Sequence, residues 1–400
     1  YALIASGLLV LRLPHWSKTW HSLRRGQLRL HWHRDRLVLG LVGLGLVFVL
    51  LLPQVLGGDP RFGPVISREL AQTLPEFQPG GRTTFWEKTT WDYWFNGSRS
   101  GLKLSMAITS PLSLLGLVLP MLWLWPRSLP LTRAVTPAVQ ILGQVMLVAT
   151  GLFLAAHALL FELYLPSRYT QHSYRLAIAI AAGIALTIVL DGALRGLMRL
   201  QSTPQQWVGL VVLGAVAIGQ LLYPQLTLSN FPWTGYEQAP RTELYAWFKQ
   251  QQQDILVAGI TREVDNIPTF AARRVLSSRE HSIPYHVGYF LPLRQRTLDV
   301  IQAQYSPNLA DVHRVIDAYA IDIWLLDAEA FNVTYPDLAW IRQFTAELQP
   351  QLAPFRAGVT PAIATQIPAC TAFANNGIIA LDARCLRNII PAGDELSSTR

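Results

Sequence analysis

The sequence predicts an α-helical polytopic membrane bundle followed by a small extracytoplasmic α/β domain. Two observations carry this prediction. The chain of 400 residues is 51% hydrophobic and only 14% charged, whereas soluble domains carry about 25% charged residues. Long apolar runs fill residues 1–223, and short apolar runs of the strand kind alternate with amphipathic helices in residues 224–400. The chain is therefore expected to divide into a transmembrane domain, 1–223, and an α/β domain, 224–400.

About six spans are expected in the first domain, because a spanning helix needs about 20 apolar residues. The opening run, Tyr1–Leu13, is too short to span alone and is interpreted as the end of a truncated span, with an unknown length of chain missing before it. Five further runs reach or approach membrane length: Leu37–Leu56, Leu104–Trp125, Pro137–Phe161, Leu176–Leu194 and Trp207–Tyr223.

Basic loops predict the orientation of these spans. They are His15–Arg36, Pro126–Thr136 and Arg195–Gln206. All three fall on one side if the runs alternate, and the positive-inside rule makes that side cytoplasmic. The long loop Gly57–Lys103 and everything after Tyr223 then lie outside. Much of the net charge of +8 belongs to these loops, so we expect no nucleic-acid partner.

The segment Leu165–Arg175 joins two apolar runs and combines aromatic, cationic and hydrogen-bonding side chains. Pro166 and the polar residues after it are expected to interrupt the helix. Arg168, Tyr169 and His172 would then lie at the outer membrane surface, where Tyr is enriched and Arg can bind phosphate in a bidentate manner. Two interpretations stay open: an interfacial anchor loop, or a binding lip for a lipid-linked phosphate.

The outer loop 57–103 is both acidic and aromatic. Trp91 and Tyr93 suit a segment at the membrane surface, beside a lipid headgroup or a sugar ring. Asp59 and Asp92 are the candidate catalytic carboxylates. Asp59 could serve as a general base or metal ligand, although an acidic residue just beyond a span can also simply end the helix in solvent.

In residues 224–400 the periodicity changes from membrane helices to alternating strands and helices. Amphipathic or helical stretches are Pro240–Gln252, Arg294–Tyr305 and Leu309–Tyr319, and the strands are Asp254–Ile260, Arg274–Ser277, Ile321–Asp327 and Ile378–Leu381. This alternation predicts a layered, Rossmann-like α/β domain with a mainly parallel sheet.

Few chemical motifs occur in this second domain. It has no glycine-rich phosphate loop and no nucleophile elbow. Glu280, His281 and His286 could gather a metal, but their spacing matches no standard zinc pattern, so we expect a polar loop there and assign no metal ligands. A divalent cation stays open as a cofactor. Cys370 and Cys385 are either a disulfide, as in an oxidising compartment, or two buried thiols.

Two passages resemble a known family. Leu165-Pro-Ser-Arg-Tyr169, leading into the small-residue helix Ala177–Leu186, resembles the Arg-Tyr segment that enters a late span in bacterial GT-C-type membrane glycosyltransferases, the mannosyltransferase-like enzymes that use polyprenyl-phosphate sugars. Asp265-Asn-Ile-Pro-Thr-Phe270, followed by Arg273-Arg-Val-Leu276 and Pro284-Tyr-His286, is similar to the soluble domain after the last span in some uncharacterised bacterial members. The resemblance implies a bacterial inner-membrane enzyme with a periplasmic C-terminal domain and a membrane-lipid partner. Family members carry a catalytic carboxylate in their first outer loop, but no local motif transfers that role to Asp59 or Asp92.

The leading hypothesis from the sequence is an inverting transferase that moves a sugar from a polyprenyl-phosphate donor to an extracytoplasmic acceptor. A carboxylate would activate the acceptor hydroxyl, while Arg168 would stabilise the phosphate leaving group. The alternative is a non-catalytic, membrane-anchored scaffold or assembly subunit whose α/β domain binds protein or glycan. A transporter is disfavoured, because no ladder of charges crosses the apolar runs.

Overall fold

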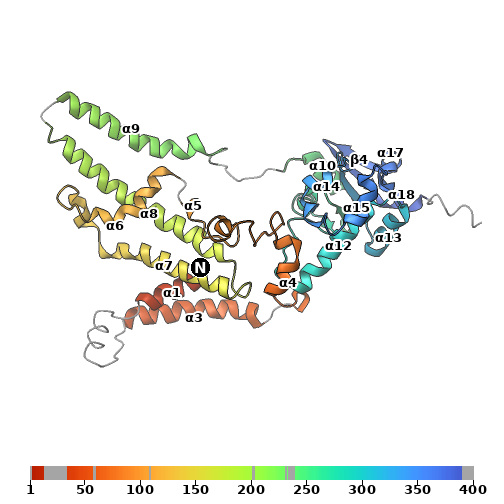
Figure 1. Ribbon diagram of the computed structural model, residues 1–400, viewed down its shortest axis with the longest axis horizontal. Coiled ribbons are helices and arrows are strands. Elements are labelled where there is room, and N and C mark those ends of the chain that lie inside the picture. The colour runs from red at the N-terminus through yellow and green to blue at the C-terminus, as the bar shows by residue number, and fades with distance from the viewer. Residues whose placement is uncertain are drawn as a thin grey trace, which may run out of the picture. The chain divides into compact units, whose positions relative to one another are not determined.

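The computed structural model describes residues 2–12, 34–56, 60–107, 110–200, 203–229, 232 and 239–389. The chain forms two compact units (Figure 1). The helical unit comprises Tyr1–Gly58 and Phe85–Tyr236, and the sheet unit comprises Asp59–Thr84 and Glu237–Arg400.

Seven α-helices lie in the described part of the helical unit. They are α1 (Ala2–Arg12), α3 (Arg34–Leu56), α5 (Leu104–Ala107), α6 (Leu114–Leu122), α7 (Gln140–Ala158), α8 (Pro166–Leu197) and α9 (Thr203–Thr227). Among the described residues, three helical stretches are long and apolar enough to cross a membrane: Pro137–Ala158, Pro166–Leu197 and Thr203–Thr227. Shorter apolar helices cover Ala2–Arg12, Val38–Leu50 and Pro111–Leu122.

Helix α8 is the centre of packing in this unit and contacts α5, α6, α7 and α9 (Figure 1). Gly116 lets α6 approach closely, because a Cβ there would lie 2.6 Å from the carbonyl oxygen of Ile178 in α8. Between α7 and α8, the hydroxyls of Thr150 and Tyr174 are 2.6 Å apart. Small residues and interhelical hydroxyl bonds are how helices associate where no hydrophobic effect drives them together.

Two expectations about this unit are wrong. The predicted span Leu104–Trp125 is not one helix, because α5 ends at Ala107 and α6 begins only at Leu114, after the 3-10 turn η4 (Pro111–Ser113). The segment Leu165–Arg175 is not a loop either. Pro166 occupies the first turn of α8, where its missing N–H and fixed φ favour a helix start, and the polar residues after it continue the helix.

The sheet unit contains five strands, β1 (Leu256–Gly259), β2 (Arg274–Val275), β3 (Ile323–Asp327), β4 (Thr371–Asn375) and β5 (Ile378–Asp382). Their order is β2-β1-β3-β5-β4. Strand β1 pairs parallel with β2 and β3, whereas β5 pairs antiparallel with both β3 and β4. The four predicted strands are present as β1, β2, β3 and β5. The sheet is mixed rather than mainly parallel, because β5 runs antiparallel to β3 and forms a hairpin with β4, a strand that was not predicted.

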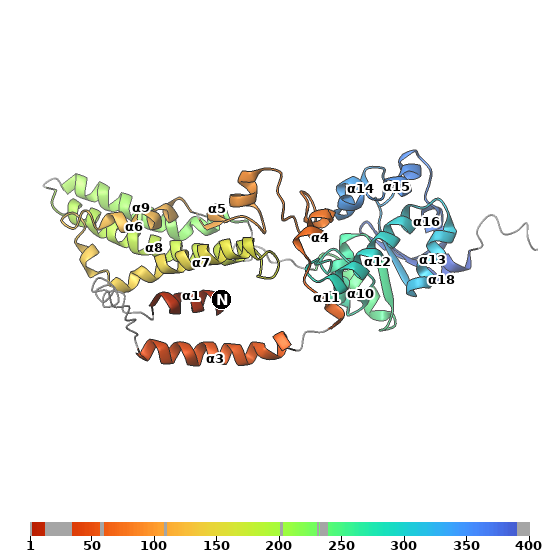
Figure 2. The ribbon, with the colours of Figure 1, turned by 60° about the horizontal axis from the view of Figure 1, so that its bottom comes forward.

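Helices cover both faces of this sheet, since alternate residues of a strand point to opposite faces. On one face, Ala258 and Trp324 share a buried core with α12 (Val287–Tyr305) and α13 (Leu309–Tyr319) (Figure 2). On the other face, Val257 and Leu325 pack with α10 (Thr242–Gln250) and α11 (Ile267–Ala271). The shorter helices are α14 (Tyr335–Leu338), α15 (Gln349–Arg356), α16 (Ala362–Thr365), α17 (Ile367–Cys370) and α18 (Ala383–Asn388).

Residues 60–84 belong to the sheet unit, although the sequence analysis assigned the whole loop 57–103 to the transmembrane domain. This segment contains α4 (Arg68–Thr73) and the 3-10 turns η1 (Pro60–Phe62) and η2 (Pro75–Phe77). Val65 forms an antiparallel bridge with His286. The backbone N–H of Ile66 donates to the carbonyl oxygen of Tyr285 over 3.0 Å. Phe77 is fully buried.

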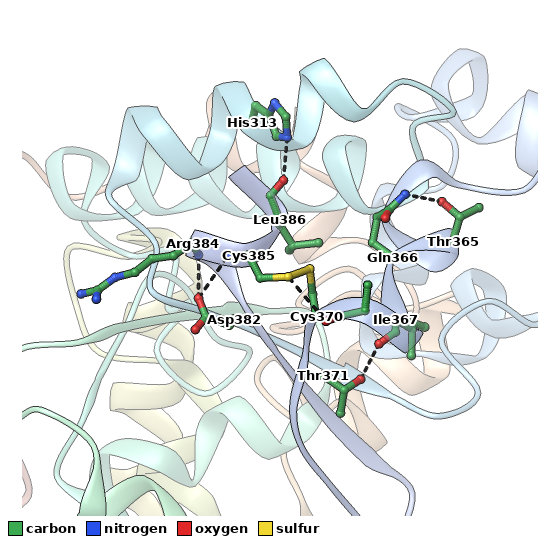
Figure 3. Close-up of a disulfide and its surroundings, with 11 residues drawn as sticks. His313, Thr365, Gln366, Ile367, Cys370, Thr371, Asp382, Arg384, Cys385 and Leu386 are labelled. Carbon is green, nitrogen blue, oxygen red and sulfur yellow. Dashed lines mark hydrogen bonds between the residues drawn. A yellow bond between two sulfur atoms is a disulfide. The ribbon is translucent and has the colours of Figure 1, made fainter. Parts of the chain in front are cut away.

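A disulfide joins Cys370, the last residue of α17, to Cys385 in α18 (Figure 3). This is one of the two alternatives that the sequence left open. The carboxylate of Asp382 caps α18 by accepting from the backbone N–H of Arg384 over 2.7 Å. His313 contacts the carbonyl oxygen of Leu386 over 2.8 Å. The bridge thus spans the hairpin β4–β5 and fixes the end of the described chain to the sheet.

Candidate functional site

Three basic residues near the start of α8 act on one another electrostatically, because the charges of Arg99 and Arg168 both affect Lys103. We call Arg99, Lys103 and Arg168 the cationic cluster. The backbone explains how two segments 60 or more residues apart come together. Ser167 donates from its backbone N–H to the carbonyl oxygen of Arg99 over 3.1 Å and from its hydroxyl to that of Ser98 over 3.1 Å. Residues 98 and 99 are thereby held against the beginning of α8.

Lys103 has a backbone conformation that is uncommon for a side chain of its size, with φ of 60°. Two hydrogen bonds hold it there: the N–H of Leu102 donates to the carbonyl oxygen of Trp94 over 2.8 Å, and the N–H of Lys103 donates to that of Phe95 over 3.0 Å. Left-handed conformations of residues other than glycine cost free energy and concentrate at functional sites. The strained residue here is one of the three cations.

Electrostatics link the members of the cluster. Burial lowers the pKa of Lys103, Glu87 opposes this shift, and the positive charges of Arg168 and Arg99 add to it. Like charges repel within this range, so each of the three cations makes a nearby anion more favourable. The N-terminus of α8 adds the positive end of a helix dipole. The arrangement favours an anion.

The sequence-predicted residues of α8 divide between its surface and its packed side. Arg168 and His172 are exposed and lie four residues apart, on the same side of the helix. Tyr169 is buried, with only 7% of its surface exposed. Tyr169 therefore packs within the helical unit, while Arg168 and His172 face outward.

An aromatic cluster anchors the segment 85–103 to α7. Trp94 stacks on His157, with ring centroids 4.7 Å apart, and Tyr93 meets the same ring edge-on at 5.4 Å. Phe85 is fully buried and contacts Phe161 at 5.4 Å. Tyr93, a predicted substrate contact, is thus a packing residue in this arrangement.

Trp91 lies differently and is 64% exposed. Its ring centroid is 4.2 Å from that of Phe95, which is itself partly exposed. Trp91 therefore presents an aromatic surface, as the sequence analysis expected of a residue beside a headgroup or sugar ring.

Both carboxylate oxygens of the candidate base Asp92 accept hydrogen bonds from nearby residues. It accepts from the hydroxyl of Thr89 over 2.7 Å and from the side-chain amide of Asn96 over 3.0 Å, at the start of a π-helical turn, η3 (Asp92–Asn96). The bonds from Asn96 and Thr89 lower the pKa of the Asp92 carboxyl. A carboxylate with a lowered pKa is a weaker proton acceptor. The other candidate, Asp59, lies outside the described residues.

An apolar cavity of about 350 Å³ lies between α6, α7 and α8. Its lining includes Gly116, Gly143, Met146 and Ile178. Leu102 and Leu104, which flank Lys103, pack against the small buried group that contains Ile178. The cavity itself lies further along α8, where Ala177, Ile178 and Ala181 line it. At a rise of 1.5 Å per residue, Ile178 is about 15 Å along the helix from Arg168.

The residues that could have gathered a metal have other partners. Glu280 forms an ion pair with Arg82 at 2.9 Å, and His281 bonds the hydroxyl of Ser278 at 2.6 Å. The ring of His286 lies against that of Phe62, with centroids 5.9 Å apart. Within the described part of the chain, no group of three or more His, Cys, Asp or Glu side chains is arranged to hold a metal ion.

Sequence reasoning missed Arg99, Lys103 and Glu87. A signal for the two cations was present, because Arg99 and Lys103 stand at the end of a loop predicted to lie outside, where positive charge is depleted. Their approach to Arg168 could not be read from spacing, since it depends on the bonds from Ser167.

No protein-family model matches this chain, and no curated protein sequence is significantly similar to it. A functional proposal for this chain therefore rests on the chemistry of the cationic cluster and its surroundings.

Proposed function

We propose that this protein is an integral membrane glycosyltransferase that moves a sugar from a polyprenyl-phosphate donor to an extracytoplasmic acceptor. The observation that carries the proposal is the cationic cluster, Arg99, Lys103 and Arg168, at the start of α8, with an apolar cavity further along the same helix. A polyprenyl-phosphate sugar has an anionic phosphate at one end and a long apolar tail. The cluster suits the phosphate, and the cavity suits the tail.

In the proposed complex, the phosphate lies at the cationic cluster, and the isoprenoid chain extends along α8 until its later units enter the cavity between α6, α7 and α8. Arg168 is exposed and makes no side-chain hydrogen bond or ion pair within the described part of the chain. Its guanidinium can bind two phosphate oxygens at once. Lys103 contributes a point charge from a partly buried position.

In the proposed reaction, the acceptor hydroxyl attacks the anomeric carbon of the donor sugar. A bond forms between the acceptor oxygen and that carbon, and the bond from the carbon to the phosphate oxygen breaks. The electron pair of the broken bond stays on the phosphate, which gains one negative charge. The cationic cluster stabilises this developing charge, and an interaction that strengthens in the transition state accelerates the step.

A carboxylate is needed to take the proton of the acceptor hydroxyl, and we assign this role to Glu87. It is half-buried and is the carboxylate that acts electrostatically on Lys103. Asp92 is a weaker candidate because Thr89 and Asn96 occupy it. Trp91, with its exposed ring, is the proposed surface for a sugar.

The proposed setting is a bacterial inner membrane, with a polytopic helical domain and the sheet unit on the periplasmic side. Two observations support this orientation. The loop Pro126–Thr136 is basic, as cytoplasmic loops are. The disulfide Cys370–Cys385 fits an oxidising compartment on the opposite side.

The test is a transfer assay with the purified chain, radiolabelled polyprenyl-phosphate sugars and a lipid extract as the acceptor source. Arg168→Ala is expected to lower the rate about 10²–10³-fold, as the loss of one charge-stabilising donor does. Arg199→Ala is the matched control, because Arg199 is also exposed and lies just beyond the other end of α8. Unchanged transfer in Arg168→Ala would contradict the role of Arg168. No transfer from any donor would favour the non-catalytic scaffold.

A further inference from the structure

The sheet unit contains a cavity that the proposed transferase does not use. Its volume is about 360 Å³, within the range of about 300–1,000 Å³ that is usual for small-molecule sites. Ile260 and Thr261, directly after β1, and Asp327, at the end of β3, contribute to its lining. The cavity therefore opens at the carboxyl ends of two parallel strands.

These two strands flank the place where the chain changes direction across the sheet. From β1 the chain passes to β2 on one side, and from β2 it returns to β3 on the other side of β1. In open α/β sheets, ligands bind at the carboxyl ends of the strands at such a switch point. The position of the cavity is thus one at which binding sites recur.

One carboxylate of the lining, that of Asp327, is held in one orientation. Asp327 accepts from the hydroxyl of Thr261 over 2.8 Å and from the hydroxyl of Tyr335. Each carboxylate oxygen has a second lone pair, so Asp327 can still accept from a ligand. Because the carboxylate of Asp327 is fixed, it favours ligands that place a hydrogen-bond donor, such as a hydroxyl, at the matching position.

A second carboxylate of the lining already accepts three hydrogen bonds. Glu263 accepts from Arg241 over 3.1 Å, from Asn266 over 3.0 Å and from the hydroxyl of Tyr245. Burial and the bond to Glu263 raise the pKa of Tyr245, so Tyr245 stays a donor at neutral pH. Glu263 therefore holds three neighbouring side chains in place, and one of them, Arg241, also lines the cavity.

The rim carries three polar groups of different kinds. Arg262, Glu329 and Asn332 line the cavity and are exposed. None of their side chains makes a hydrogen bond within the described part of the chain. Arg262 can only donate, Glu329 can only accept, and Asn332 can do both. A ligand with several adjacent hydroxyls, each a donor and an acceptor, can satisfy all three.

An aromatic side chain completes the lining. Trp340 donates from its indole N–H to the carbonyl oxygen of Ile260 over 2.7 Å, and its ring meets that of Phe344 edge-on at 6.1 Å. These contacts fix the indole ring. Part of the ring surface stays exposed, because Trp340 is only half-buried. A fixed aromatic ring beside planar polar groups matches a sugar, which has apolar C–H faces and a polar edge.

The charges of the lining exclude a phosphate as the preferred ligand. Three carboxylates, Glu263, Asp327 and Glu329, outnumber the two guanidiniums of Arg241 and Arg262. The turn after β1 also lacks the glycines whose backbone N–H groups cradle phosphates. A neutral, hydroxyl-rich ligand meets no such repulsion.

We propose that this cavity in the sheet unit is a binding site for a neutral sugar unit, built by Asp327, Glu329, Asn332, Arg262 and Trp340. The site would bind sugar whether or not the helical unit catalyses transfer, so the inference goes beyond the proposed function and does not depend on it.

The test is saturation-transfer difference NMR on the intact chain in lauryldimethylamine oxide, a detergent without a sugar headgroup. The probes are methyl α-D-mannoside, methyl β-D-glucoside, methyl β-D-galactoside and N-acetylglucosamine. At least one is expected to receive saturation. Glu329→Ala and Asn332→Ala, both at exposed positions, are expected to weaken its binding by about tenfold each, the effect of one lost hydrogen bond to a charged or polar partner.

Asp254→Asn is the matched control, because Asp254 is exposed and precedes β1 at the opposite, amino end of the strand. It should leave binding unchanged. The proposal is overturned if none of the four sugars receives saturation. It is equally overturned if the signal is the same in both rim variants as in the unaltered chain, or if inorganic phosphate displaces the bound sugar.

Discussion

The guanidinium of Arg294 in α12 donates from Nε to Oε1 of Glu76 over 2.8 Å, joining residues that are 218 positions apart in the chain. Glu76 is only 1% exposed. Arg294 also bonds Glu347 through its terminal nitrogens, and its guanidinium lies 5.5 Å from the ring centre of Phe344. This pair ties the segment 60–84 into the sheet unit.

Loss of Arg294 should therefore destabilise the sheet unit strongly. Arg294→Met leaves the Glu76 carboxyl buried without its cation, and removing one partner of a buried pair costs about 3–5 kcal/mol. Arg356→Met is the control. Its ion pair with Asp337 is more exposed, and the expected cost is below about 1 kcal/mol.

Hydrogen exchange can measure this difference locally. The amides of Ile66 and Val287 bridge the segment 60–84 to the rest of the unit through the carbonyl oxygens of Tyr285 and Pro64. Both amides should exchange much faster in Arg294→Met and at the normal rate in Arg356→Met. Equal protection in the two variants would show that the pair does not hold the segment.

Glu76 should also make the stability of the sheet unit depend on pH. Burial raises the pKa of its carboxyl, although Arg294 acts in the opposite direction. A carboxyl with a raised pKa in the folded state binds its proton more tightly when folded. Its contribution to the free energy of unfolding is then complete below the unfolded pKa of about 4.3 and is lost as pH rises through the folded pKa.

A comparison with Glu76→Gln isolates this contribution, because glutamine does not titrate. The unaltered chain should gain stability relative to Glu76→Gln as the pH falls from neutral toward 4, measured by urea unfolding at each pH. A difference that stays constant, or that grows as pH rises, would refute the sign of the shift.

The disulfide should stabilise the sheet unit by constraining its unfolded state. Cys370 and Cys385 are 15 residues apart, and in the chain-entropy model a loop of that length contributes about 3 kcal/mol. The double variant Cys370→Ser, Cys385→Ser should lose about this amount in urea unfolding. Addition of a reductant should destabilise the unaltered chain and leave the double variant unaffected.

The proposed transferase should bind its phosphate-bearing donor less tightly at alkaline pH, because the cationic cluster loses positive charge there. The pKa of Lys103 is lowered by burial and by the neighbouring guanidiniums, so Lys103 should lose its charge at a lower pH than an ordinary lysine. The KM for a polyprenyl-phosphate sugar should rise as pH approaches that value. In Lys103→Arg the rise should move to higher pH, because arginine stays charged. An identical pH profile in both proteins would exclude Lys103 from phosphate binding.

Much of the sheet unit could be predicted because local patterns determine it. The apolar runs 254–260 and 321–327 are β1 and β3, and the helix expected at 309–319 is α13. The hairpin β4–β5 was missed, although its turn carried a signal. Asn376 and Gly377 both have positive φ, 46° and 76°, and Asn-Gly is the strongest short signal for a two-residue hairpin turn.

The candidate sites depend on long-range contacts that no local pattern shows. The predicted helix break at Pro166 is wrong, because a proline is as compatible with the first turn of a helix as with the end of one. The division of the loop 57–103 between two units follows from partners such as His286 and Arg294, which are more than 200 residues away. Arg168 was found from its residue type and position, whereas Lys103 and Arg99 required the fold.

The most direct measurement counts both products of one reaction. The purified chain is incubated with a polyprenyl-phosphate sugar and an acceptor extract, and mass spectrometry measures free polyprenyl phosphate and glycosylated acceptor over time. We expect the two to appear in equal amounts, and both to slow in Glu87→Gln and Arg168→Ala but not in Arg199→Ala. Release of polyprenyl phosphate without glycosylated acceptor, or consumption of no donor at all, would contradict the proposed transferase.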